Sequence, residues 1–349
     1  MEIVSPTICA IGTAVPAFRL NQEEAFQLCE YKSALIRNIF LNSDIDYRHF
    51  YLDRNLGNLG LRGTSNDFNR RYLEGAMKTG CQAIQVCLQS VDMTPDDIDF
   101  LIVCTSTGYV CPDLGSRLIG HMGFRHDIQR GSMLGLGCGG ALPTLQRACD
   151  FVRAYPGRRA LMLAVEICSA CYFVDSSMET VVGNAICADG AAAFLLGTAS
   201  QKRGLGPSIV DFQSCIDPAQ IGKVGFEHRD GKLRIVLATE VRDVASALIE
   251  RALDPLLERN RLSRSDIRFW VAHPGGRKVI DKIQQHFDLT DSQLKFSSTV
   301  LRSYGNMSSP TVMFVLNEVI RNGSPRQGDW GAMIALGPGM AAEVALLQW

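Results

Sequence analysis

The sequence has no long hydrophobic run and almost no net charge, and each absence narrows the possible functions. No stretch approaches the roughly 18 to 20 consecutive apolar residues that span a membrane. The formal net charge is −1, so bulk electrostatics gives no argument for binding nucleic acid or an anionic membrane. The N-terminal residues, MEIVSPTICAIGTAVP, lack a basic segment, so we expect no signal peptide. These absences predict a cytoplasmic protein that binds neither nucleic acid nor a membrane.

The cysteines are numerous but form no paired framework. The chain has 12 cysteines among 349 residues, scattered through apolar segments. In a chain this long, that distribution favours a reducing compartment without disulfides. Cys168 and Cys171 form a C-x-x-C pair, but a zinc site needs a second pair and a redox site needs a polar helix start. The pair lies in a strongly apolar stretch with no matching pair, so we expect no metal site.

Alternating apolar strands and amphipathic helices predict an α/β fold with a covered sheet. The chain is long enough to bury a large core, and its apolar fraction is 46%. Helices are expected over residues 22–42 and 304–320, among others. The composition becomes polar and glycine-rich around residues 199–206, which predicts a boundary between two similar halves, 1–200 and 201–349. In each half, a buried strand runs into a glycine turn.

The stretch over residues 131–150 is the most informative local feature. Residues 133–136 are predicted as a strand, a glycine turn surrounds Cys138, and an apolar-periodic helix follows. Cys138 is therefore expected near a helix N-terminus, whose partial positive charge favours the thiolate over the thiol. The flanking glycines allow close approach of a substrate and leave backbone N–H groups free to bind an oxyanion. The turn is typical of a nucleophilic thiol.

Two other interpretations of this turn stay open from its residues alone. A free cysteine is most often a small buried hydrophobe. Gly135, Gly137 and Gly140 also match G-x-G-x-x-G, and Glu166 ends a later strand about where a dinucleotide-binding fold places its ribose carboxylate. That pattern predicts a dinucleotide-dependent oxidoreductase. A thiol between the glycines adds nothing to pyrophosphate binding, so residues further along the chain must decide.

Two polar residues of the second half stand at the ends of apolar segments. His273 follows the strand expected over residues 269–272 and precedes a Pro-Gly-Gly turn, a position suited to chemistry. Asn306 lies in YGNMSSP, where a helix is expected to begin, and by itself it has the sequence position of an N-cap.

A thiol, an imidazole and an amide together predict acyl transfer. Cys138 would accept an acyl group from a thioester. His273 and Asn306 would donate hydrogen bonds to the carbonyl of a second thioester while decarboxylation of a malonyl unit forms an enolate. His273 is also expected to stabilise the thiolate as an ion pair. This chemistry needs no metal.

These segments resemble the type III polyketide synthases, relatives of chalcone synthase in the thiolase superfamily. The similarity extends over nearly the whole chain, in GCGG at Cys138, WVAHPGG at His273, YGNMSSP at Asn306, ADGAAAFLLG at residues 188–197 and ALGPGMAAEVALLQW at the C-terminus. It implies a homodimer of five-layered αβαβα subunits. It also implies iterative condensation of malonyl-CoA onto a starter acyl group and then cyclisation, with Cys138, His273 and Asn306 as catalytic residues. No cofactor is expected beyond the coenzyme A thioesters that serve as substrates.

Departures from the family pattern concern the pocket. Cys187 replaces one gating phenylalanine, and a second gating phenylalanine aligns near Ile235. A pocket threonine aligns with Cys171, and a methionine that reaches across the dimer aligns with Cys111. The smaller side chains predict a wider pocket, so a coumaroyl starter is not assumed. The residues expected to line the pocket are Ser106, Cys111, Cys171, Cys187, Ile235, Ser308, Gly337, Pro338 and Gly339.

The family's basic cluster for the coenzyme A phosphates is poorly matched, since residues 37–48 read RNIFLNSDIDYR. The starter is therefore expected on either coenzyme A or an acyl carrier protein. The cations that could substitute for the cluster are Arg37, Arg277 and Lys278, with Lys32 and Arg48 as further candidates.

Three rival functions remain at this point. One is a ketoacyl synthase III, which performs a single condensation with an acyl carrier protein. Another is the dinucleotide-dependent oxidoreductase, which gives His273 and Asn306 no shared role. The third is a catalytically silent partner subunit of the thiolase fold, which the intact set of three residues disfavours. The resemblance assigns Glu166 and Asp189 structural rather than catalytic roles.

Overall fold

The computed structural model describes residues 5–52, 63–198, 206–238 and 240–349. The expected boundary at residues 199–206 lies almost wholly outside the described residues, and the division into two halves stays a prediction. The strands are β1 (Pro6–Ala14), β2 (Phe18–Asn21), β3 (Tyr47–Phe50), β4 (Phe100–Thr105), β5 (Gln129–Leu134), β6 (Ala160–Ile167), β7 (Asp189–Thr198), β8 (Ser208–Ile216), β9 (Val224–Arg229), β10 (Lys232–Leu237), β11 (Ile267–Ala272), β12 (Trp330–Gly337) and β13 (Ala341–Gln348). The helices are α1 (Gln22–Leu28), α2 (Ala34–Leu41), α3 (Ser65–Gln89), α4 (Leu114–Met122), α5 (Ala141–Ala154), α6 (Met178–Ile186), α7 (Val241–Arg259), α8 (Arg277–Phe287), α9 (Asp291–Tyr304) and α10 (Ser309–Asn322).

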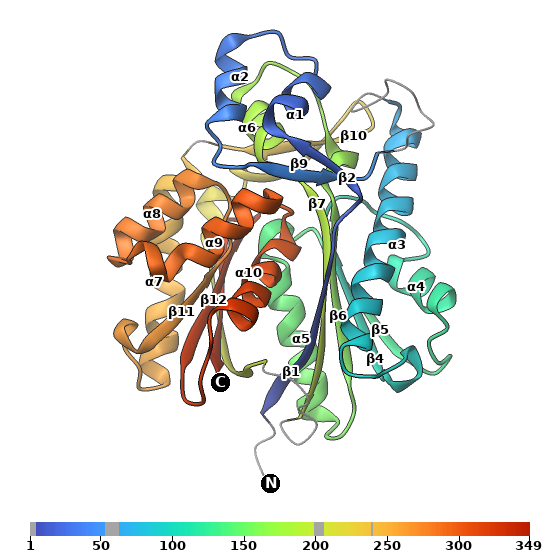
Figure 1. Ribbon diagram of the computed structural model, residues 1–349, viewed down its shortest axis with the longest axis vertical. Coiled ribbons are helices and arrows are strands. Elements are labelled where there is room, and N and C mark those ends of the chain that lie inside the picture. The colour runs from blue at the N-terminus through green and yellow to red at the C-terminus, as the bar shows by residue number, and fades with distance from the viewer. Residues whose placement is uncertain (1–4, 53–62, 199–205, 239) are drawn as a thin grey trace.

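The main sheet consists of two half-sheets that meet edge to edge (Figure 1). Its strand order within the described residues is β11-β12-β13-β8-β1-β7-β6-β4-β5. Thr7 pairs with Ser208 where β1 meets β8, and their hydroxyl oxygens are 3.0 Å apart. Each half-sheet has parallel pairs on its outer side, β4 with β5 and β6 in one and β11 with β12 in the other. The pairs nearer the junction are antiparallel.

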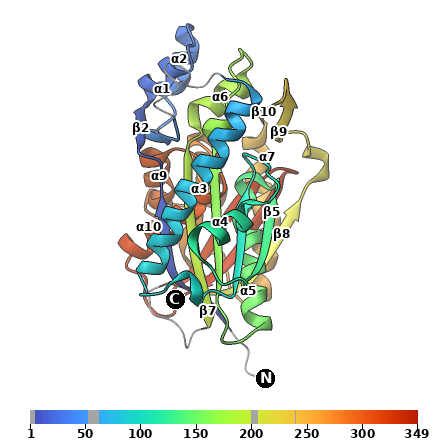
Figure 2. The same ribbon diagram turned by 90° about the vertical axis from the view of Figure 1, so that its right-hand side faces the viewer.

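Helices cover the outer faces of both half-sheets and also lie between them (Figures 1 and 2). Helices α3 and α4 pack on the outer face of the first half-sheet, and α7 packs on the second. Helices α5 and α10 contact strands of both half-sheets and form the central layer. The five-layered αβαβα arrangement expected from the sequence is therefore present.

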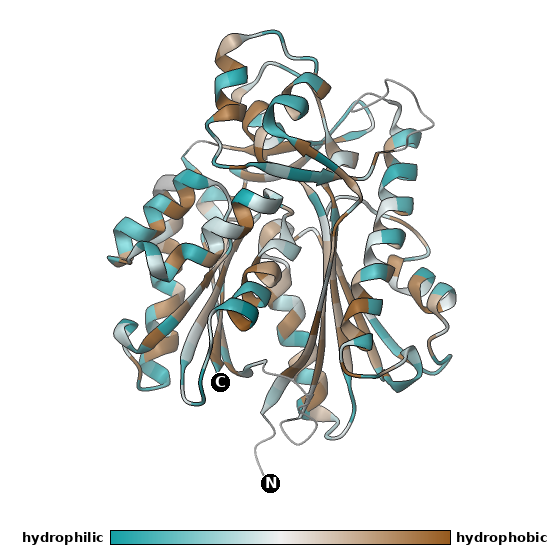
Figure 3. Cartoon of the chain, viewed as in Figure 1, coloured by the Kyte–Doolittle hydropathy of each residue, from teal (hydrophilic) through white to brown (hydrophobic). Residues whose placement is uncertain are grey.

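The central strands are apolar on both faces because both faces are covered. In β7, Ala193 and Leu195 pack in the core beneath α3, whereas Phe194 and Leu196 face the core of the central layer. Figure 3 shows the resulting concentration of hydrophobic residues along the inner strands and the central helices. This explains why these strands read as continuous apolar runs rather than as alternating ones.

A separate two-stranded hairpin, β9 with β10, lies outside the main sheet. Its turn contains Asp230 (φ 51°) and Gly231 (φ 71°), the left-handed pair of conformations that a tight hairpin turn requires. The hairpin packs through β10 against α6. It is the element that completes one wall of the cavity described below.

The prediction of one continuous helix over residues 22–42 is wrong, because the structure has two helices there. Helix α1 ends at Leu28 and α2 begins at Ala34. Glu30 adopts a left-handed conformation (φ 57°) between them. The interruption allows Tyr31 to pack edge-on against Phe40, with ring centroids 6.1 Å apart.

The helix predicted over residues 304–320 is also wrong at its start. Helix α9 ends at Tyr304, and α10 begins only at Ser309. Gly305 (φ 73°) turns the chain out of α9, and its missing side chain matters because a Cβ there would lie 2.9 Å from Cγ of Arg48. Asn306 is consequently not an N-cap; it stands in the extended segment between the two helices.

Candidate active site

Cys138 lies in the tight turn that connects β5 to α5. The turn is a short 3-10 segment, Gly137–Gly139, and Gly137 has a positive φ of 50°. The backbone N–H of Gly137 donates to Oγ of Ser106 at 2.8 Å, which fixes the turn from behind. On its other side, a Cβ added to Gly139 would lie 3.1 Å from Cα of Gly337. The glycines are therefore required because two main chains meet directly beside the thiol.

His273 is held at the end of β11 by the sheet itself. Its backbone N–H donates to the carbonyl of Ile334 at 2.8 Å, which continues the pairing of β11 with β12. The imidazole is buried, and neither Nδ1 nor Nε2 has a hydrogen-bond partner among the described residues. Burial lowers the pKa of His273 to about 4, so the ring is neutral at pH 7 and carries one N–H donor. A buried imidazole with both nitrogens free is available to a ligand.

Hydrogen bonds of its main chain fix the position of Asn306, and a hydrogen bond of its side chain fixes the orientation of the amide. Its N–H donates to the carbonyl of Ile186 at 2.8 Å, and its carbonyl accepts from the N–H of Ala188 at 2.8 Å. Its Oδ1 accepts from the N–H of Ser308 at 2.8 Å, which leaves the amide nitrogen 3.4 Å from the carbonyl oxygen of Gly275, two residues after His273. Sγ of Cys138 lies 4.0 Å from Oδ1 of Asn306.

The three predicted catalytic residues therefore converge on one cavity of about 90 Å³. Predicted pocket residues Cys187, Ile235, Ser308, Gly337 and Pro338 line the same cavity. Most of the remaining lining is apolar: Ile186, Val224, Phe226, Val236, Leu237, Val241, Val279, Leu336 and Met340.

The expectation that the helix end would favour the thiolate of Cys138 is wrong for this structure. Burial raises the pKa of the Cys138 thiol to about 12, and the contacts of the thiol with the side chains of Ser308 and Asn306 only partly oppose that rise. Loss of hydration disfavours the charged thiolate. The expected ion pair with His273 is absent too, since both ring nitrogens lack a partner within the described residues. The cavity therefore holds a neutral thiol and a neutral imidazole.

Comparisons with known proteins identify the family to which the chain belongs. The family model "Chalcone and stilbene synthases, C-terminal domain" matches residues 213–349, and "FAE1/Type III polyketide synthase-like protein" matches residues 51–208. The 3,5-dihydroxyphenylacetyl-CoA synthase of Streptomyces toyocaensis is 32% identical over 99% of this chain and 90% of its own length. The chain belongs to the type III polyketide synthase family. It is therefore an acyltransferase of the condensing type rather than an oxidoreductase or a ketoacyl synthase III.

Two further relatives agree with this placement. The 1,3,6,8-tetrahydroxynaphthalene synthase of Streptomyces peucetius subsp. caesius is 32% identical over 98% of this chain and 93% of its own length. The crystal structure of PKS-I from the brown alga Ectocarpus siliculosus superposes with a TM-score of 0.92 at 26% identity, covering 100% of this chain and 99% of that one. The thiolase-like fold of the polyketide synthase is thereby confirmed.

Glu166 connects the two halves of the site in this polyketide synthase. The carboxylate is fully buried and accepts from the backbone N–H of Ser106 at 2.9 Å and from the hydroxyl of Ser309 at 3.1 Å. Burial raises its pKa to about 7, opposed by these bonds and by those from Thr107. Ser106 in turn holds the Cys138 turn, while Ser309 begins α10 next to the Asn306 segment. Glu166 is thus fully engaged inside the protein and unavailable to a ribose.

Asp189 has a similar internal position. Its carboxylate accepts from the backbone N–H of Tyr51 at 2.6 Å and of Ser169 at 2.7 Å. Burial raises its pKa to about 6, opposed first by the hydroxyl of Ser169. It ties the start of β7 to the segment after β6, which is a structural function.

Four predicted pocket residues lie elsewhere. Ser106 is buried behind the Cys138 turn, and Gly339 follows Pro338 outside the cavity lining. Cys111 is exposed, because its loop lies on the surface at the outer end of the sheet. Cys171 lines a second, smaller cavity of about 10 Å³, where its thiol donates to the carbonyl of Thr107 at 3.2 Å. Cys171 is therefore separate from the lining of the main cavity, and its role in the substrate pocket stays a prediction.

The candidate coenzyme A cations divide into two groups. Arg48 is completely buried, where Nη1 donates to the carbonyls of Asn184 and Cys187 at 2.7 Å each, so it cannot reach a phosphate. Arg37 is exposed but is paired with Glu23 at 2.8 Å. Arg277 and Lys278 are exposed at the start of α8, directly after the turn that carries Gly275 of the cavity wall. Lys32 is exposed before α2.

Sequence reasoning assigned Ile235 of β10 to the pocket but missed β9, the other strand of the hairpin. Val224, Gly225 and Phe226 of β9 line the cavity, but no strand was predicted there. A signal was available: Asp230-Gly231 separates two short apolar-alternating segments, which is the typical pattern of a tight hairpin.

The described residues hold no group of histidine, cysteine and acidic side chains suited to a metal ion. All 12 cysteines are free thiols. Over the described ranges, no helix combines the length and the apolar character needed to cross a bilayer.

Proposed function

We propose that this polyketide synthase extends a starter acyl group bound to Cys138 with malonyl-CoA units and then cyclises the chain. The observation that carries the proposal is the convergence of Cys138, His273 and Asn306 on one largely apolar cavity. An apolar cavity excludes water from a reactive polyketide intermediate and strengthens every hydrogen bond to a developing charge.

Loading of the starter begins with attack of Sγ of Cys138 on the thioester carbonyl. The thiol proton passes to His273, whose neutral ring nitrogens have no competing partner. The tetrahedral intermediate then collapses, the carbon–sulfur bond to coenzyme A breaks, and the proton returns from His273 to the departing coenzyme A thiolate. The products are an acyl-Cys138 thioester and free coenzyme A. An oxyanion would be bound by backbone N–H groups of the turn other than those of Gly137 and Gly140, which already donate to Ser106 and to the carbonyl of Gly137.

Extension then uses His273 and Asn306 together. Their N–H donors would bind the thioester oxygen of malonyl-CoA, where negative charge develops as carbon dioxide leaves and an enolate forms. The hydrogen bond from Ser308 to Oδ1 of Asn306 supports this role, because it keeps the amide oxygen away from the developing oxyanion. The enolate carbon attacks the acyl carbonyl on Cys138, and the thiolate of Cys138 is the leaving group.

The side chains that line the cavity limit the size of the starter and of the product. Cys187 and Ile235 leave more room than aromatic side chains would, which supports starters other than a coumaroyl group. The two relatives described above are named for polyhydroxylated aromatic products, and an aromatic product of that class is part of this proposal. Arg277 and Lys278 are the cations we assign to the phosphates of coenzyme A, because they adjoin the cavity wall. An acyl carrier protein stays an alternative donor of the starter.

A homodimer in the cytoplasm completes the proposal. Leu134 at the end of the edge strand β5 is 49% exposed, and Tyr109 in the adjoining loop is 50% exposed. Apolar side chains at an open sheet edge support contact with a second copy of the chain. Cys111 lies in the same loop, where the family places a residue that reaches across the dimer.

The test is incubation with malonyl-CoA, with and without a panel of acyl-CoA starters, followed by mass spectrometry of the products. We expect product masses that correspond to a starter plus several decarboxylated malonyl units. The Cys138→Ala variant is the matched negative control. A wild-type enzyme that releases no carbon dioxide and forms no extended product with any starter would contradict the proposal.

A further inference from the structure

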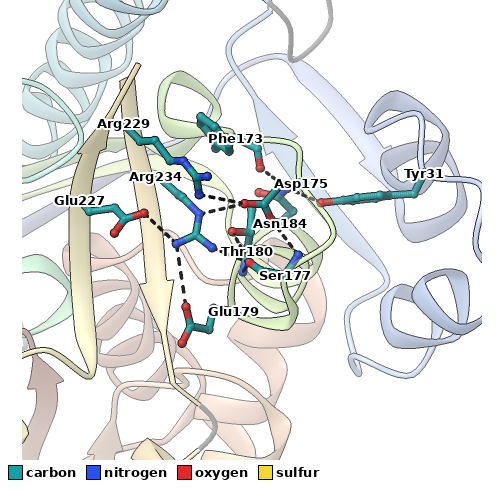
Figure 4. Close-up of polar contacts among 10 residues, drawn as sticks. All are labelled: Tyr31, Phe173, Asp175, Ser177, Glu179, Thr180, Asn184, Glu227, Arg229 and Arg234. Carbon is teal, nitrogen blue, oxygen red and sulfur yellow. Dashed lines mark hydrogen bonds and ion pairs between the residues drawn. The ribbon is translucent and has the colours of Figure 1, made fainter. Parts of the chain in front are cut away.

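Arg234 of β10 is almost fully buried and yet carries a charge that several carboxylates surround (Figure 4). The residue is 6% exposed. Its Nε lies 3.0 Å from Oδ2 of Asp175, and Nη1 lies 3.0 Å from Oε1 of Glu227 and 3.9 Å from Oε2 of Glu179. Nη2 donates to the hydroxyl of Ser177. Asp175 and the N-cap Ser177 directly precede α6, Glu179 lies in its first turn, and Glu227 lies on β9.

The partners of Arg234 are themselves part of the N-terminal end of α6. Ser177 is the N-cap, and its hydroxyl accepts from the N–H of Thr180 at 3.4 Å. The backbone N–H of Ser177 donates to Oδ1 of Asp175 at 3.0 Å. Arg234 therefore joins the hairpin to a helix end whose backbone N–H groups are capped by Asp175 and Ser177.

The hairpin needs such an attachment because no strand ladder joins it to the main sheet. Strands β9 and β10 form a two-stranded sheet of their own within the described residues. An isolated hairpin of two strands is only marginally stable in water. Charge-assisted hydrogen bonds from a desolvated guanidinium are among the strongest polar contacts that can hold it.

The contact between the hairpin and α6 forms a wall of the acyl cavity. Ile235, the residue after Arg234, lies against Gly183 so closely that a Cβ on Gly183 would be 2.5 Å from Cγ2 of Ile235. Ile235 and Phe226 line both the main cavity and the smaller one, which lies between the hairpin and α6 and also touches Gly183 and Cys187. Arg234 lines neither cavity.

We propose that Arg234 is a positioning residue that holds β10 against α6 and thereby limits the length of acyl chain the cavity accepts. It acts through Ile235 and Phe226, and the inference rests on the proposed function in that the acyl chain on Cys138 occupies this cavity. Without the guanidinium, β10 separates from α6, the smaller cavity opens into the main one, and longer chains fit.

The test compares Arg234→Met with the wild type for a series of acyl-CoA starters of increasing length. The first readout is acylation of Cys138, followed by mass spectrometry of the intact protein, and it does not require extension. The matched control is Arg229→Met, since Arg229 lies on the same hairpin and faces the same Asp175, but at 3.9 Å and with a side chain that is 54% exposed. Exposed pairs contribute little.

We expect Arg234→Met to raise the ratio of kcat/KM for long over short starters by about tenfold, the discrimination that one or two methylene groups provide in an apolar pocket. Arg229→Met leaves this ratio unchanged. Malonyl-CoA decarboxylation, which depends on His273 and Asn306, stays within about twofold of the wild type in both variants. Arg234→Lys keeps the charge without the forked donors and gives an intermediate ratio.

An unchanged length ratio in Arg234→Met would overturn the inference, and so would an equal shift in Arg229→Met. If circular dichroism shows that Arg234→Met does not fold, the same ratio of kcat/KM for long over short starters is measured for Asp175→Asn. That variant weakens the same attachment from the α6 side, and an unchanged ratio would overturn the inference. A wild-type enzyme whose Cys138 is acylated but which does not extend malonyl-CoA contradicts the proposed function alone.

Discussion

Asn306 and Cys187 are paired side by side as an isolated parallel β-bridge. The bridge consists of the hydrogen bonds from Asn306 to Ile186 and from Ala188 to Asn306, each 2.8 Å long. The residue to which we assign the catalytic amide and the residue aligned with the family's gating position are therefore parts of one backbone unit. A substitution of the Asn306 side chain leaves this bridge intact, so its effect on activity can be separated from an effect on the pocket.

Replacement of Cys138 by alanine should abolish condensation while the fold persists. The thiol is the only nucleophile at the turn, and loss of a covalent nucleophile costs about a thousandfold or more in kcat. Product formation and the thermal midpoint are measured together. The half-buried Cys215 of β8 provides a control, because Cys215→Ala should retain turnover. Extended products from Cys138→Ala at the wild-type rate would refute the mechanism.

His273→Ala and Asn306→Ala should each lose malonyl-CoA decarboxylation. One fixed donor to a developing oxyanion contributes about 10²- to 10³-fold in rate, and each variant removes one. Release of carbon dioxide from labelled malonyl-CoA is the measurement. Asn322→Ala, at the exposed end of α10, is the control and should decarboxylate normally. Full decarboxylation in either active-site variant would show that its assigned role is wrong.

Cys187→Phe should shorten or redirect the products. Cys187 lines both cavities, so an aromatic ring there occupies the space between β10 and α6. The product distribution is determined by chromatography and mass spectrometry. Cys187→Ala, which adds no volume, should keep the wild-type distribution. Identical products from the phenylalanine variant would mean that the growing chain does not pass this residue.

The rate at which iodoacetamide alkylates Cys138 should rise by about tenfold per pH unit between pH 6 and 9. The pKa of the thiol is raised to about 12 by burial, so the thiolate fraction grows throughout this range without a plateau. His273, with a pKa of about 4, is neutral over the whole range and adds no inflection. Peptide mass spectrometry follows the modification of Cys138. A rate that is flat above pH 6 would instead indicate a thiolate–imidazolium pair.

The local features of the site could be predicted because each depends on a few residues that are neighbours in the sequence. The glycine turn at Cys138 and the strand end at His273 were both identified from short patterns, and the structure places them as expected. The β9 strand of the hairpin wall was missed although Asp230-Gly231 signalled the hairpin turn. Cys111 was assigned by alignment to the residue that reaches across the dimer; it is exposed in the single chain, and its role in the pocket stays a prediction.

The protonation of the site was predicted in the wrong direction for a physical reason. A helix N-terminus can be recognised in the sequence, and it lowers the pKa of a thiol. Desolvation depends on which distant segments cover the thiol, and here burial raises the pKa of Cys138 instead. Arg48 was misjudged similarly, because nothing in its own segment indicates complete burial.

The sequence by itself determined the class of this protein: α/β layers, a thiol on a glycine turn, an imidazole at a strand end and an amide in GNMSS. These depend on interactions between near neighbours, whose energetics are readable from residue type and spacing. Only the tertiary structure decided which side chains share the cavity, how Glu166 joins its two sides, and how Arg234 attaches the hairpin to α6. Those relationships join residues that lie far apart in the chain, and burial and charge pairing arise only when the folded layers bring them together.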